Sequence, residues 1–556
     1  MIVNKQPTLK LSFLGGVGEV GKNMLAVEYG DDMIIVDAGV AFPSDDMPGI
    51  DLIIPDFNYI QVNKHRVKAI ILTHGHEDHI GAMPYLMRQI DAPVYATKLT
   101  AALVENKLRE HKGVRFKINI VKPKTVINAG VFSIEFLKVT HSISGSLALA
   151  VTTPAGIWFH TGDFKLDLTP IDGEPMDMAR MTDISKKGVL LLTCDSTNAE
   201  RTGFSMSERK VGQTLDALFA QNKIKRIIIA TFASNIHRIQ QIFNICEKYE
   251  RKVLPTGRSM VNVCEIANKI GELKFNKEII ADMTKVDKYD DDKICIVCTG
   301  SQGEPNSALS RMAAGEFKKI EINENDCVIF SASAIPGNEA GINTVINGLY
   351  KKGASVIYES LAEVHVSGHA YQEEIKIIMS LLKPKFFIPV HGEYRHLISN
   401  AKIAMELGIN KRNIHIPDLG ESISVTPTTI RKTGTVPAGV KVIDGHDISD
   451  AGGSVQRDRL LLATEGLCVV LLTISARSSV LTSKPEIITR GFLYGKSNQN
   501  IIEEARDLLI NAIIQVNFKS QDWTIIKDSI KKTLTTFFFK KLKRKPMIMT
   551  IIVETN

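Results

Sequence analysis

Cysteine is scarce in this chain, and long apolar runs are missing from it. The 556 residues include seven cysteines, an odd number that argues against a disulfide framework and fits a reducing cytosol. No apolar stretch reaches the roughly 18 residues that a membrane-spanning helix needs, and residues 1–6 lack the apolar core of a secretory signal peptide. We therefore expect a soluble, cytoplasmic protein with no membrane span.

A large excess of one charge is missing as well. Lysine and arginine number 68 and aspartate and glutamate 61, which gives a net charge of +7. This surplus permits a polyanionic partner but does not demonstrate one. The 44% of hydrophobic and 23% of charged residues are ordinary for a globular protein. The length suggests about three or four domains.

The pattern of apolar runs divides the chain into regions. Residues 1–205 alternate short β-rich runs with turns and have few helical stretches, such as 79–89, which is typical of packed sheets flanked by helices. Residues 206–360 alternate strand-like and helical stretches, as a parallel α/β sheet does. Because another apolar strand, 386–390, precedes a histidine, we interpret 206–360 as an insertion and 361–430 as the second part of the first domain.

The C-terminal part is expected to be a small α+β domain. Residues 431–450 are predicted to form a linker and residues 451–556 the domain itself. Its expected elements are strands over most of 442–472, helices over 501–516 and from 523, and a final strand over 547–553. The predicted fold class is therefore α/β, with an inserted α/β domain and a C-terminal α+β domain.

Two short motifs have an ordinary structural explanation. The run Gly16–Gly21 matches G-x-G-x-x-G, but dinucleotide binding requires a helix next, and residues 22–28 have the pattern of a strand. We interpret this run as a hairpin turn. Cys295 and Cys298 form a C-x-x-C inside an apolar run, and no second C-x-x-C completes a zinc site. A buried strand is expected there.

The strongest chemical signal is the hexapeptide His74-Gly-His76-Glu-Asp78-His79, which directly follows a strand-like run. The alternate residues His74 and His76 can face one cation, while Asp78 and His79 can reach another from the turn. Neutral imidazoles and carboxylates are the ligands that borderline divalent metals prefer. The sequence therefore predicts a metal site, the alternative being a polar surface loop.

Three more ligand-type side chains stand just after apolar strands: His141, Asp163 and His391. A loop beyond a strand can expose such a side chain beside the sheet. Each alone would be an ordinary loop or core residue. Together with the hexapeptide, we predict that they are further metal ligands. Zinc suits such a histidine-rich site, and manganese is an alternative.

This pattern resembles the metallo-β-lactamase superfamily, a four-layer αββα fold that binds two metal ions. The resemblance implies two sets of ligands, one made of His74, His76 and His141 and the other of Asp78, His79 and His391, with Asp163 bridging the two ions. Asp37 matches the family's first motif, in which the aspartate supports the histidines and does not bind metal.

Further positions narrow the resemblance. Asp195, His369 and His391 look like motifs A, B and C of the β-CASP nucleases, in which a nucleotide-gripping domain is inserted into the lactamase-like one. Histidine at the third motif is similar to the RNA-cleaving members. The stretches 232–238 and 299–305 and the terminal Lys545-Pro-Met-Ile resemble the bacterial ribonuclease J family, and the likeness covers essentially the whole chain.

The resemblance implies a function and a state of assembly. It implies a two-metal ribonuclease that is a 5′→3′ exonuclease with a preference for 5′-monophosphate ends, either with or without endonuclease activity, in mRNA decay and rRNA maturation. It further implies RNA as the partner and a homodimer or homotetramer, alone or with a paralogous subunit, assembled through the C-terminal domain.

Phosphodiester hydrolysis also needs a proton for the leaving 3′ oxygen. Asp195 and His369 are the predicted proton-transfer pair, and the metal ligand Asp78 is counted with them as catalytic. The alternative for the pair is that it only orients the metal ligands.

A phosphate-binding pocket is predicted from small residues that expose backbone N–H groups beside hydroxyls and imidazoles. By the resemblance, it recognises a 5′-monophosphate. Its expected members are Ala233, Ser234, Asn235, His365, Val366, Ser367, Gly368 and His369.

Three weaker signals have two interpretations each. Phe42 is expected either to stack on a base, as similar aromatics do, or to lie in the core. Residues 540–545 include five basic side chains, which form either a solvated helix end or a patch that grips RNA. Asp51 and Asp444 either share a structural cation such as calcium, by weak resemblance, or are ordinary loop aspartates.

Two other functions stay open at this point. A small-molecule hydrolase, such as a lactonase or thioesterase, would share the hexapeptide but not the inserted α/β region. A catalytically silent RNA-binding scaffold would share the fold, but the intact set of ligands argues against it.

Overall fold

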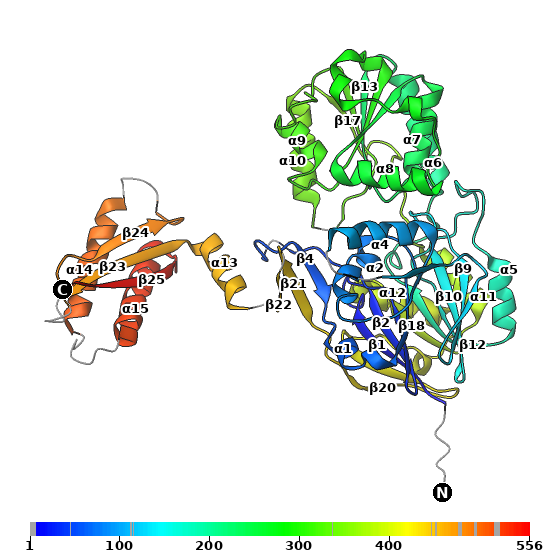
Figure 1. The fold of residues 1–556 in the computed structure, drawn as a ribbon, viewed down its shortest axis with the longest axis horizontal. Helices are drawn as coiled ribbons and strands as arrows, with labels where there is room; N and C mark the ends of the chain where they lie inside the picture. The colour runs from blue at the N-terminus through cyan, green and yellow to red at the C-terminus, as the bar shows by residue number, and fades with distance from the viewer. Residues whose placement is uncertain are drawn as a thin grey trace, which may run out of the picture. The chain divides into compact units, whose positions relative to one another are not determined.

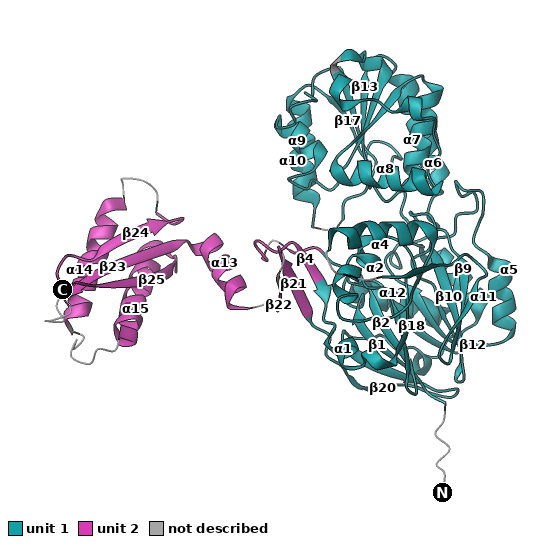
Figure 2. Ribbon diagram, in the orientation of Figure 1, with its two compact units in different colours: residues 1–41, 54–439 teal, residues 42–53, 440–556 magenta. Residues whose placement is uncertain are grey.

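The computed structural model describes residues 7–44, 46–111, 114, 116–335, 337–445, 447–450, 453–475, 481–493, 498–515 and 523–555. The chain divides into two compact units, residues 1–41 with 54–439 and residues 42–53 with 440–556 (Figure 2). Predictions that concern residues 1–6 and Val516 lie outside the described residues. The domain boundaries drawn from the sequence stay predictions.

The first unit contains two sheets that pack face to face. The larger has the order β20-β19-β1-β2-β3-β5-β6-β7. Its strands are β1 (Leu9–Gly15), β2 (Met24–Tyr29), β3 (Asp32–Val36), β5 (Val67–Ile71), β6 (Val94–Ala96), β7 (Ile118–Ile120), β19 (Glu421–Val425) and β20 (Ile430–Thr435). The run Gly16–Gly21 joins the antiparallel strands β1 and β2, so the predicted hairpin turn is confirmed and dinucleotide binding there is excluded.

The second sheet has the order β18-β12-β11-β10-β9-β8. Apolar side chains such as Phe13 and Ile71 of the larger sheet and Trp158 and Ile388 of this one form the buried core between the two. The strands of the second sheet are β8 (Val126–Ala129), β9 (Phe132–Lys138), β10 (Leu147–Thr153), β11 (Gly156–His160), β12 (Val189–Asp195) and β18 (Phe386–Val390).

Helices lie outside both sheets, which gives the predicted αββα layers (Figure 1). Met181, Ile378 and Ile403, from three of these helices, are packed in one buried cluster with Phe159 and Phe387 of the second sheet. On the larger sheet, the helix of residues 98–110 contacts β6 and β7. The helices are α1 (Asn58–Val62), α2 (Glu77–Ile80), α3 (Met83–Leu86), α4 (Lys98–Glu110), α5 (Met178–Lys186), α11 (Gln372–Leu382) and α12 (Tyr394–Glu406), with the 3₁₀ turns η1 (Lys64–Arg66) and η5 (Lys411–Asn413).

The helix expected over 79–89 is wrong, because two short helices, α2 and α3, occupy that stretch. Gly81 ends the first of them, and Pro84 stands in the first turn of the second, where its missing N–H is tolerated. The early end of α2 leaves His79 buried at the end of a short turn.

The predicted insertion is a parallel α/β domain of order β14-β15-β13-β16-β17. Helices cover both sides of this sheet in Figure 1, and Cys295 and Cys298 are buried in β15, as expected. The elements are α6 (Glu208–Gln221), β13 (Arg226–Ala230), α7 (Ile236–Lys248), β14 (Lys252–Thr256), α8 (Arg258–Ile270), η2 (Lys277–Ile279), η3 (Met283–Lys288), η4 (Asp291–Lys293), β15 (Ile294–Cys298), α9 (Ala308–Ala314), β16 (Asp326–Phe330), α10 (Glu339–Lys351) and β17 (Ser355–Ile357).

The second unit has a three-stranded sheet of order β24-β23-β25, with two helices packed on one face. Strands were expected over most of residues 442–472, but a helix, α13, occupies residues 454–465. The strand prediction is therefore wrong for that stretch. Residues 431–450, the expected linker, include strands. The elements are β21 (Val440–Asp444), β22 (Asp447–Asp450), α13 (Ser454–Glu465), β23 (Leu467–Ser475), β24 (Glu486–Arg490), α14 (Gln499–Gln515), α15 (Trp523–Leu542) and β25 (Met547–Thr555). Strand β4 (Leu52–Pro55) has its first two residues in this unit and its last two in the first.

Among the described residues, no helix has both the length and the apolar character required to cross a membrane.

Candidate active site

Strand direction gathers the predicted ligands at one edge of the second sheet. Strands β11, β12 and β18 are parallel neighbours, and β9 runs the same way because it and β11 are both antiparallel to β10. The residues that follow these strands therefore emerge at the same edge: His141, Asp163 and His391, with Asp195 as the last residue of β12. In the larger sheet, β3 and β5 are also parallel, so Asp37 and the hexapeptide follow neighbouring strand ends.

Three histidines and one aspartate form a first group. His76 Nδ1 lies 3.1 Å from His74 Nε2 and 3.1 Å from His141 Nε2. Asp163 Oδ2 lies 3.6 Å from His74 Nε2 and 3.8 Å from His141 Nε2. The four ligand atoms lie within 4.8 Å of one another, so these side chains can share one cation.

A second group shares Asp163 with the first. His79 Nε2 lies 3.2 Å from Asp163 Oδ2 and 3.6 Å from Asp78 Oδ2. His391 lies between the two carboxylates, with Nδ1 3.0 Å from Asp163 Oδ1 and Nε2 3.3 Å from Asp78 Oδ2. The structure thus brings together all seven residues that the sequence singles out as ligands, in the two expected sets, and Asp163 faces both.

Asp37 fixes the orientation of this cluster through its contacts with His79 and Thr73. Its Oδ2 lies 2.8 Å from His79 Nδ1, and its carboxylate accepts hydrogen bonds from the backbone N–H and the hydroxyl of Thr73. Asp37 and His391 both have left-handed backbone conformations, with φ of 61° and 55°, which non-glycine residues rarely adopt. Such local strain persists where the surrounding structure enforces it, as at functional sites.

The charge states of the first group suit metal binding. Burial lowers the pKa of His74 and His141 well below the ordinary value, and the neighbouring imidazoles add to this effect. Burial likewise lowers the pKa of His76 to about 4. Although burial opposes ionisation of Asp163, the imidazoles of His391, His79 and His74 hold its pKa well below the usual range. The histidines are therefore neutral and the carboxylate is charged near pH 7.

The second group shows why a cation belongs there. Burial disfavours a charged His79, yet the carboxylates of Asp163, Asp78 and Asp37 raise its pKa well above the ordinary value. His79 Nδ1 faces the Asp37 carboxylate, so Nε2 is left to face Asp163 and Asp78. A lone pair opposite two carboxylates is repulsive unless a proton or a metal ion lies between them.

Two further observations fit a divalent metal. His391 Nε2 is buried and faces the Asp78 carboxylate at 3.3 Å, but no described residue makes a well-aligned hydrogen bond with it. His141 Nδ1 lies 2.7 Å from the Gly368 carbonyl oxygen, which can only accept, so this nitrogen bears the proton and Nε2 keeps its lone pair for the cluster. The donors present therefore fit a metal ion, with imidazole and carboxylate ligands and hydrogen-bonded outer partners.

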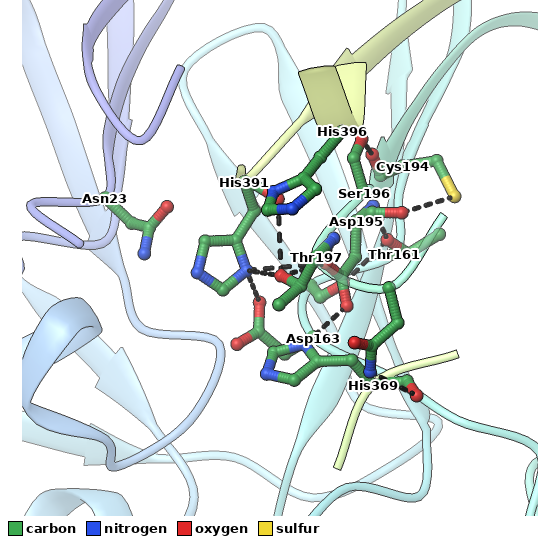
Figure 3. Close-up of polar contacts among 12 residues, drawn as sticks. Asn23, Thr161, Asp163, Cys194, Asp195, Ser196, Thr197, His369, His391 and His396 are labelled. Carbon is green, nitrogen blue, oxygen red and sulfur yellow. Dashed lines mark hydrogen bonds and ion pairs between the residues drawn. The ribbon is translucent and has the colours of Figure 1, made fainter. Parts of the chain in front are cut away.

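Asp195 and His369 form a pair beside the second group. His369 Nδ1 lies 2.7 Å from Asp195 Oδ2, while Asp195 Oδ1 accepts hydrogen bonds from the backbone N–H and hydroxyl of Thr197. Asp195 Oδ1 also lies 3.5 Å from His391 Nδ1. Figure 3 shows His391, Asp163, Asp195 and His369 turned toward one another, so the predicted proton-transfer pair adjoins the ligands.

The loop 365–369 contacts the cluster through its backbone. A Cβ on Gly368 would lie 2.7 Å from Ser142 Oγ and 2.8 Å from the His141 ring, so glycine is needed for this close approach. Val366 is buried, and its place in the pocket stays a prediction. His365 Nδ1 contacts Ser333 Oγ.

The other half of the predicted pocket, residues 233–235, precedes α7. Asn235 Oδ1 accepts from the Arg238 backbone N–H, so this side chain caps the helix. The Arg238 guanidinium donates to the Ser331 carbonyl, and the Ser331 hydroxyl donates to the Val364 carbonyl, next to His365. This chain of hydrogen bonds connects the two halves of the predicted pocket.

The remaining predictions concern Phe42, the aspartates Asp51 and Asp444, and the basic residues of 540–545. Phe42 is 66% exposed, so the core interpretation is wrong and base stacking stays a prediction. Asp444 pairs with Arg459 at 2.6 Å, and Asp51 accepts from the Gly445 N–H, so both carboxylates have partners; a calcium ion there stays a prediction. The basic side chains of 540–545 are exposed at and beyond the end of α15, and their contact with RNA stays a prediction.

Three residues of the site are missing from the sequence prediction: Asn23, Thr197 and Asn198. Asn23 Nδ2 lies 3.1 Å from His79 Nε2 and 3.3 Å from Asp78 Oδ2. Only the position of Asn23 after a glycine-rich turn distinguishes it in the sequence. Thr197 and Asn198 follow the buried strand β12 directly, as the predicted ligands follow theirs, and that signal was available.

Four family models match the chain, and each covers one part of it. They are the metallo-beta-lactamase superfamily over residues 17–196, the ribonuclease J beta-CASP domain over 224–349, the Zn-dependent metallo-hydrolase RNA specificity domain over 354–417 and the ribonuclease J C-terminal domain over 454–555.

Curated relatives match over nearly the full length. Ribonuclease J 1 of Streptococcus pyogenes is 40% identical over 549 residues, which is 98% of this chain and 97% of that protein. Ribonuclease J2 of Bacillus subtilis is 39% identical over 550 residues, 98% of each. A crystal structure of a protein of unknown function from Enterococcus faecalis aligns with a TM-score of 0.54 and 17% identity, over 75% of this chain and 100% of that one. That last likeness concerns the fold alone.

Domain order, site geometry and full-length identity agree. The chain belongs to the ribonuclease J family, with a metallo-β-lactamase domain, a β-CASP insertion and a ribonuclease J C-terminal domain.

Proposed function

We propose that this chain is a metal-dependent ribonuclease that hydrolyses RNA phosphodiesters. We further propose that it degrades RNA in the 5′→3′ direction from a 5′-monophosphorylated end, that it also cleaves internally, and that it acts in mRNA decay and rRNA maturation. The main support is that seven ligand-type side chains from distant parts of the chain meet beside the Asp195–His369 pair. Membership of the ribonuclease J family supports RNA as the substrate.

The two ligand groups would each hold one divalent cation. His74, His76 and His141 face one position and Asp78, His79 and His391 the other, and Asp163 contacts both. Divalent cations held there would lower the pKa of water and compensate charge on the phosphoryl oxygens. Zinc suits the number of imidazoles, and manganese accepts the same donor atoms.

His369 is the proposed proton donor to the leaving 3′ oxygen. Its Nδ1 is engaged by Asp195, so Nε2 is the atom that remains for proton transfer. Thr197 holds the other carboxylate oxygen of Asp195, which leaves Oδ2 directed at His369. Asp195 thereby orients the ring and stabilises its charged form. The competing role, orientation of His391, has support from its 3.5 Å distance to Asp195 Oδ1.

The loop 365–369 and residues 233–235 would bind the 5′-phosphate. Burial lowers the pKa of His365 well below the ordinary value, and the cations Arg238, Lys165 and Arg201 lower it further. Three basic side chains are therefore close enough to His365 to act on it electrostatically. Hydroxyls and backbone N–H groups beside these side chains favour an anion.

Assembly into a dimer or tetramer, alone or with a paralogous subunit, is a further part of the proposal. The sheet of the second unit buries one face against α14 and α15. On β25, the alternate residues Met549, Ile551 and Val553 are 49%, 43% and 43% exposed. An apolar sheet face left open to this extent is typical of a protein interface.

The experiment is digestion of 5′-labelled, monophosphorylated RNA with and without a chelator. We expect the wild type to release mononucleotides, and we expect chelation or Asp78→Ala to abolish the release. Asp183→Ala, which removes an exposed surface carboxylate that pairs with Lys186, is the matched control and should leave the activity intact. RNA hydrolysis that survives chelation, or no hydrolysis at all, would refute the proposal.

A further inference from the structure

Asn198 links the strand that ends in Asp195 to the loop 365–369. Its Nδ2 lies 2.6 Å from Ser367 Oγ and 3.3 Å from the His369 carbonyl oxygen. Ser367 Oγ in turn lies 3.2 Å from the His369 backbone nitrogen. Asn198 is 9% exposed, so these contacts are largely shielded from water.

The network fixes which atom donates in each contact. A carbonyl oxygen can only accept, so the atom of Asn198 that faces the His369 carbonyl must be the amide NH₂ and not the amide oxygen. The same NH₂ group therefore also donates to Ser367 Oγ. The His369 backbone N–H can only donate, and it donates to that oxygen as well.

These two donors occupy both lone pairs of the Ser367 hydroxyl oxygen. Its own hydrogen must then point away from Asn198 and from the His369 backbone. Within the described part of the chain, this O–H has no acceptor. Ser367 is only partly buried, so the hydrogen is available to a ligand of the loop.

We infer that Asn198 is a specificity-determining positioning residue, which turns the Ser367 hydroxyl into a fixed hydrogen-bond donor for the 5′-phosphate of the RNA. The inference rests on the proposed function and adds a residue to it. Asn198 does not touch the phosphate in this account; it acts through Ser367. An oriented donor costs little to reorganise when the anion binds, and hydrogen bonds to charged groups are among the stronger ones.

The same residue couples end recognition to the reacting centre. Asn198 also holds the His369 carbonyl, and His369 contacts Asp195 through its ring. Gly368, between Ser367 and His369, accepts from His141. One short loop therefore joins the predicted phosphate donor, the proton-transfer pair and a predicted metal ligand.

The test compares kcat/KM for two RNAs of one sequence that carry either a 5′-monophosphate or a 5′-hydroxyl. The ratio of the two values measures end discrimination. In Asn198→Ala we expect the ratio to fall roughly tenfold or more, because a hydrogen bond to a charged group loses its fixed donor. In Asn198→Asp, which keeps the shape, we expect a larger fall, because the carboxylate would accept the Ser367 proton and repel the phosphate.

The controls separate this role from a structural one. Asn410→Asp makes the same chemical change at an exposed helix-capping residue and should keep the wild-type ratio. In a Ser367→Ala background, Asn198→Ala should change the ratio little further, because the two residues act as one unit. Bound metal and circular dichroism, measured on each variant, check that the site and fold persist.

An unchanged ratio in both Asn198 variants would overturn the inference, and so would an equal loss of kcat/KM on the 5′-monophosphate and 5′-hydroxyl RNAs. It would also be overturned if Asn198→Ala lowered the ratio as much in the Ser367→Ala background as in the wild type. A wild-type ratio of one would overturn it by a different route, because it removes the 5′-end preference itself. Absence of RNA hydrolysis by the wild type would refute the proposed function, so the failures are distinguishable.

Discussion

His369 Nδ1 lies 2.7 Å from Asp195 Oδ2, although 174 residues separate the two along the chain. The pair is held on one side by Thr197 and adjoins His391 on the other. Burial lowers the pKa of His369, but the Asp195 carboxylate and its hydrogen bond outweigh this effect and raise it above the ordinary value. A partly buried imidazole whose pKa is raised by a carboxylate is suited to protonate a leaving oxygen.

Removal of this imidazole should slow the chemical step. We expect His369→Ala to lower the single-turnover rate of RNA hydrolysis by about 10²- to 10⁴-fold, the usual contribution of general acid–base catalysis. Bound metal per chain should stay at the wild-type value, because the proposed ligands remain. A full single-turnover rate would exclude proton transfer by His369, and a loss of metal would favour the ligand-orienting role.

Gly39 controls the position of Asp78 through its lack of a side chain. A Cβ at this position would lie 1.6 Å from the Asp78 carbonyl oxygen and 2.0 Å from its carbonyl carbon. We therefore expect Gly39→Ala to displace the backbone of Asp78 and His79 and to weaken metal binding at least tenfold, as changes around metal ligands do. Titration of the chelator-treated protein with Zn²⁺ measures this. Gly439→Ala, where the nearest atom would be 3.8 Å away, is the control, and equal affinities in both variants would contradict the prediction.

Arg238 and Glu208 form a buried, two-pronged ion pair in the inserted domain, with distances of 2.8 and 2.9 Å and no exposure of Arg238. Glu208→Ala would leave a buried guanidinium without its partner, which destabilises a fold by about 3–5 kcal/mol. We expect a clear drop in the midpoint of thermal unfolding. Asp216→Ala, which removes the partner of the exposed Lys248, should leave the midpoint nearly unchanged. Equal shifts in the two variants would be inconsistent with this account.

His365 should stay neutral throughout the range from about pH 6 to 8. Burial lowers its pKa well below the ordinary value, and Arg238, Lys165 and Arg201 oppose a further positive charge. Its contribution to 5′-phosphate binding is therefore expected to be independent of pH in this range, since protonation would occur only in more acidic solution. Its ring NMR signals should not move between these pH values. A titration centred near the ordinary histidine pKa would contradict this prediction.

Much of the site could be predicted from the sequence because its residues stand at strand ends. His74, Asp163 and His391 each follow a short apolar run, and parallel strands place their ends at one edge of a sheet. The family resemblance then supplied the grouping of the ligands. Asn23 could not be found this way, because its contact with Asp78 depends on how the β1–β2 turn packs against a distant loop.

The errors of fold prediction also have physical causes. The helix α13 has no buried residue, and its Leu460–Leu462 run was interpreted as part of a strand. Strand β10 lies in the second sheet but has the sequence LALAVTT, in which alanine and leucine give little β signal, so the sequence predicts it poorly. At β10 tertiary contacts, and not local propensity, decide the structure. At α13 the reverse holds, because leucine, alanine, glutamate and arginine are good helix formers and the helix has no buried residue.

The most direct test of the central claim is RNA hydrolysis measured as a function of bound metal. Chelator-treated protein is titrated with Zn²⁺, and in parallel with Mn²⁺, while bound metal per chain and cleavage of monophosphorylated RNA are both recorded. If two cations share Asp163, hydrolysis should stay near zero up to about one ion per chain and rise as the second binds. In His391→Ala, binding should stop near one ion and the activity should not appear. Full hydrolysis with one ion, or with none, would contradict the account.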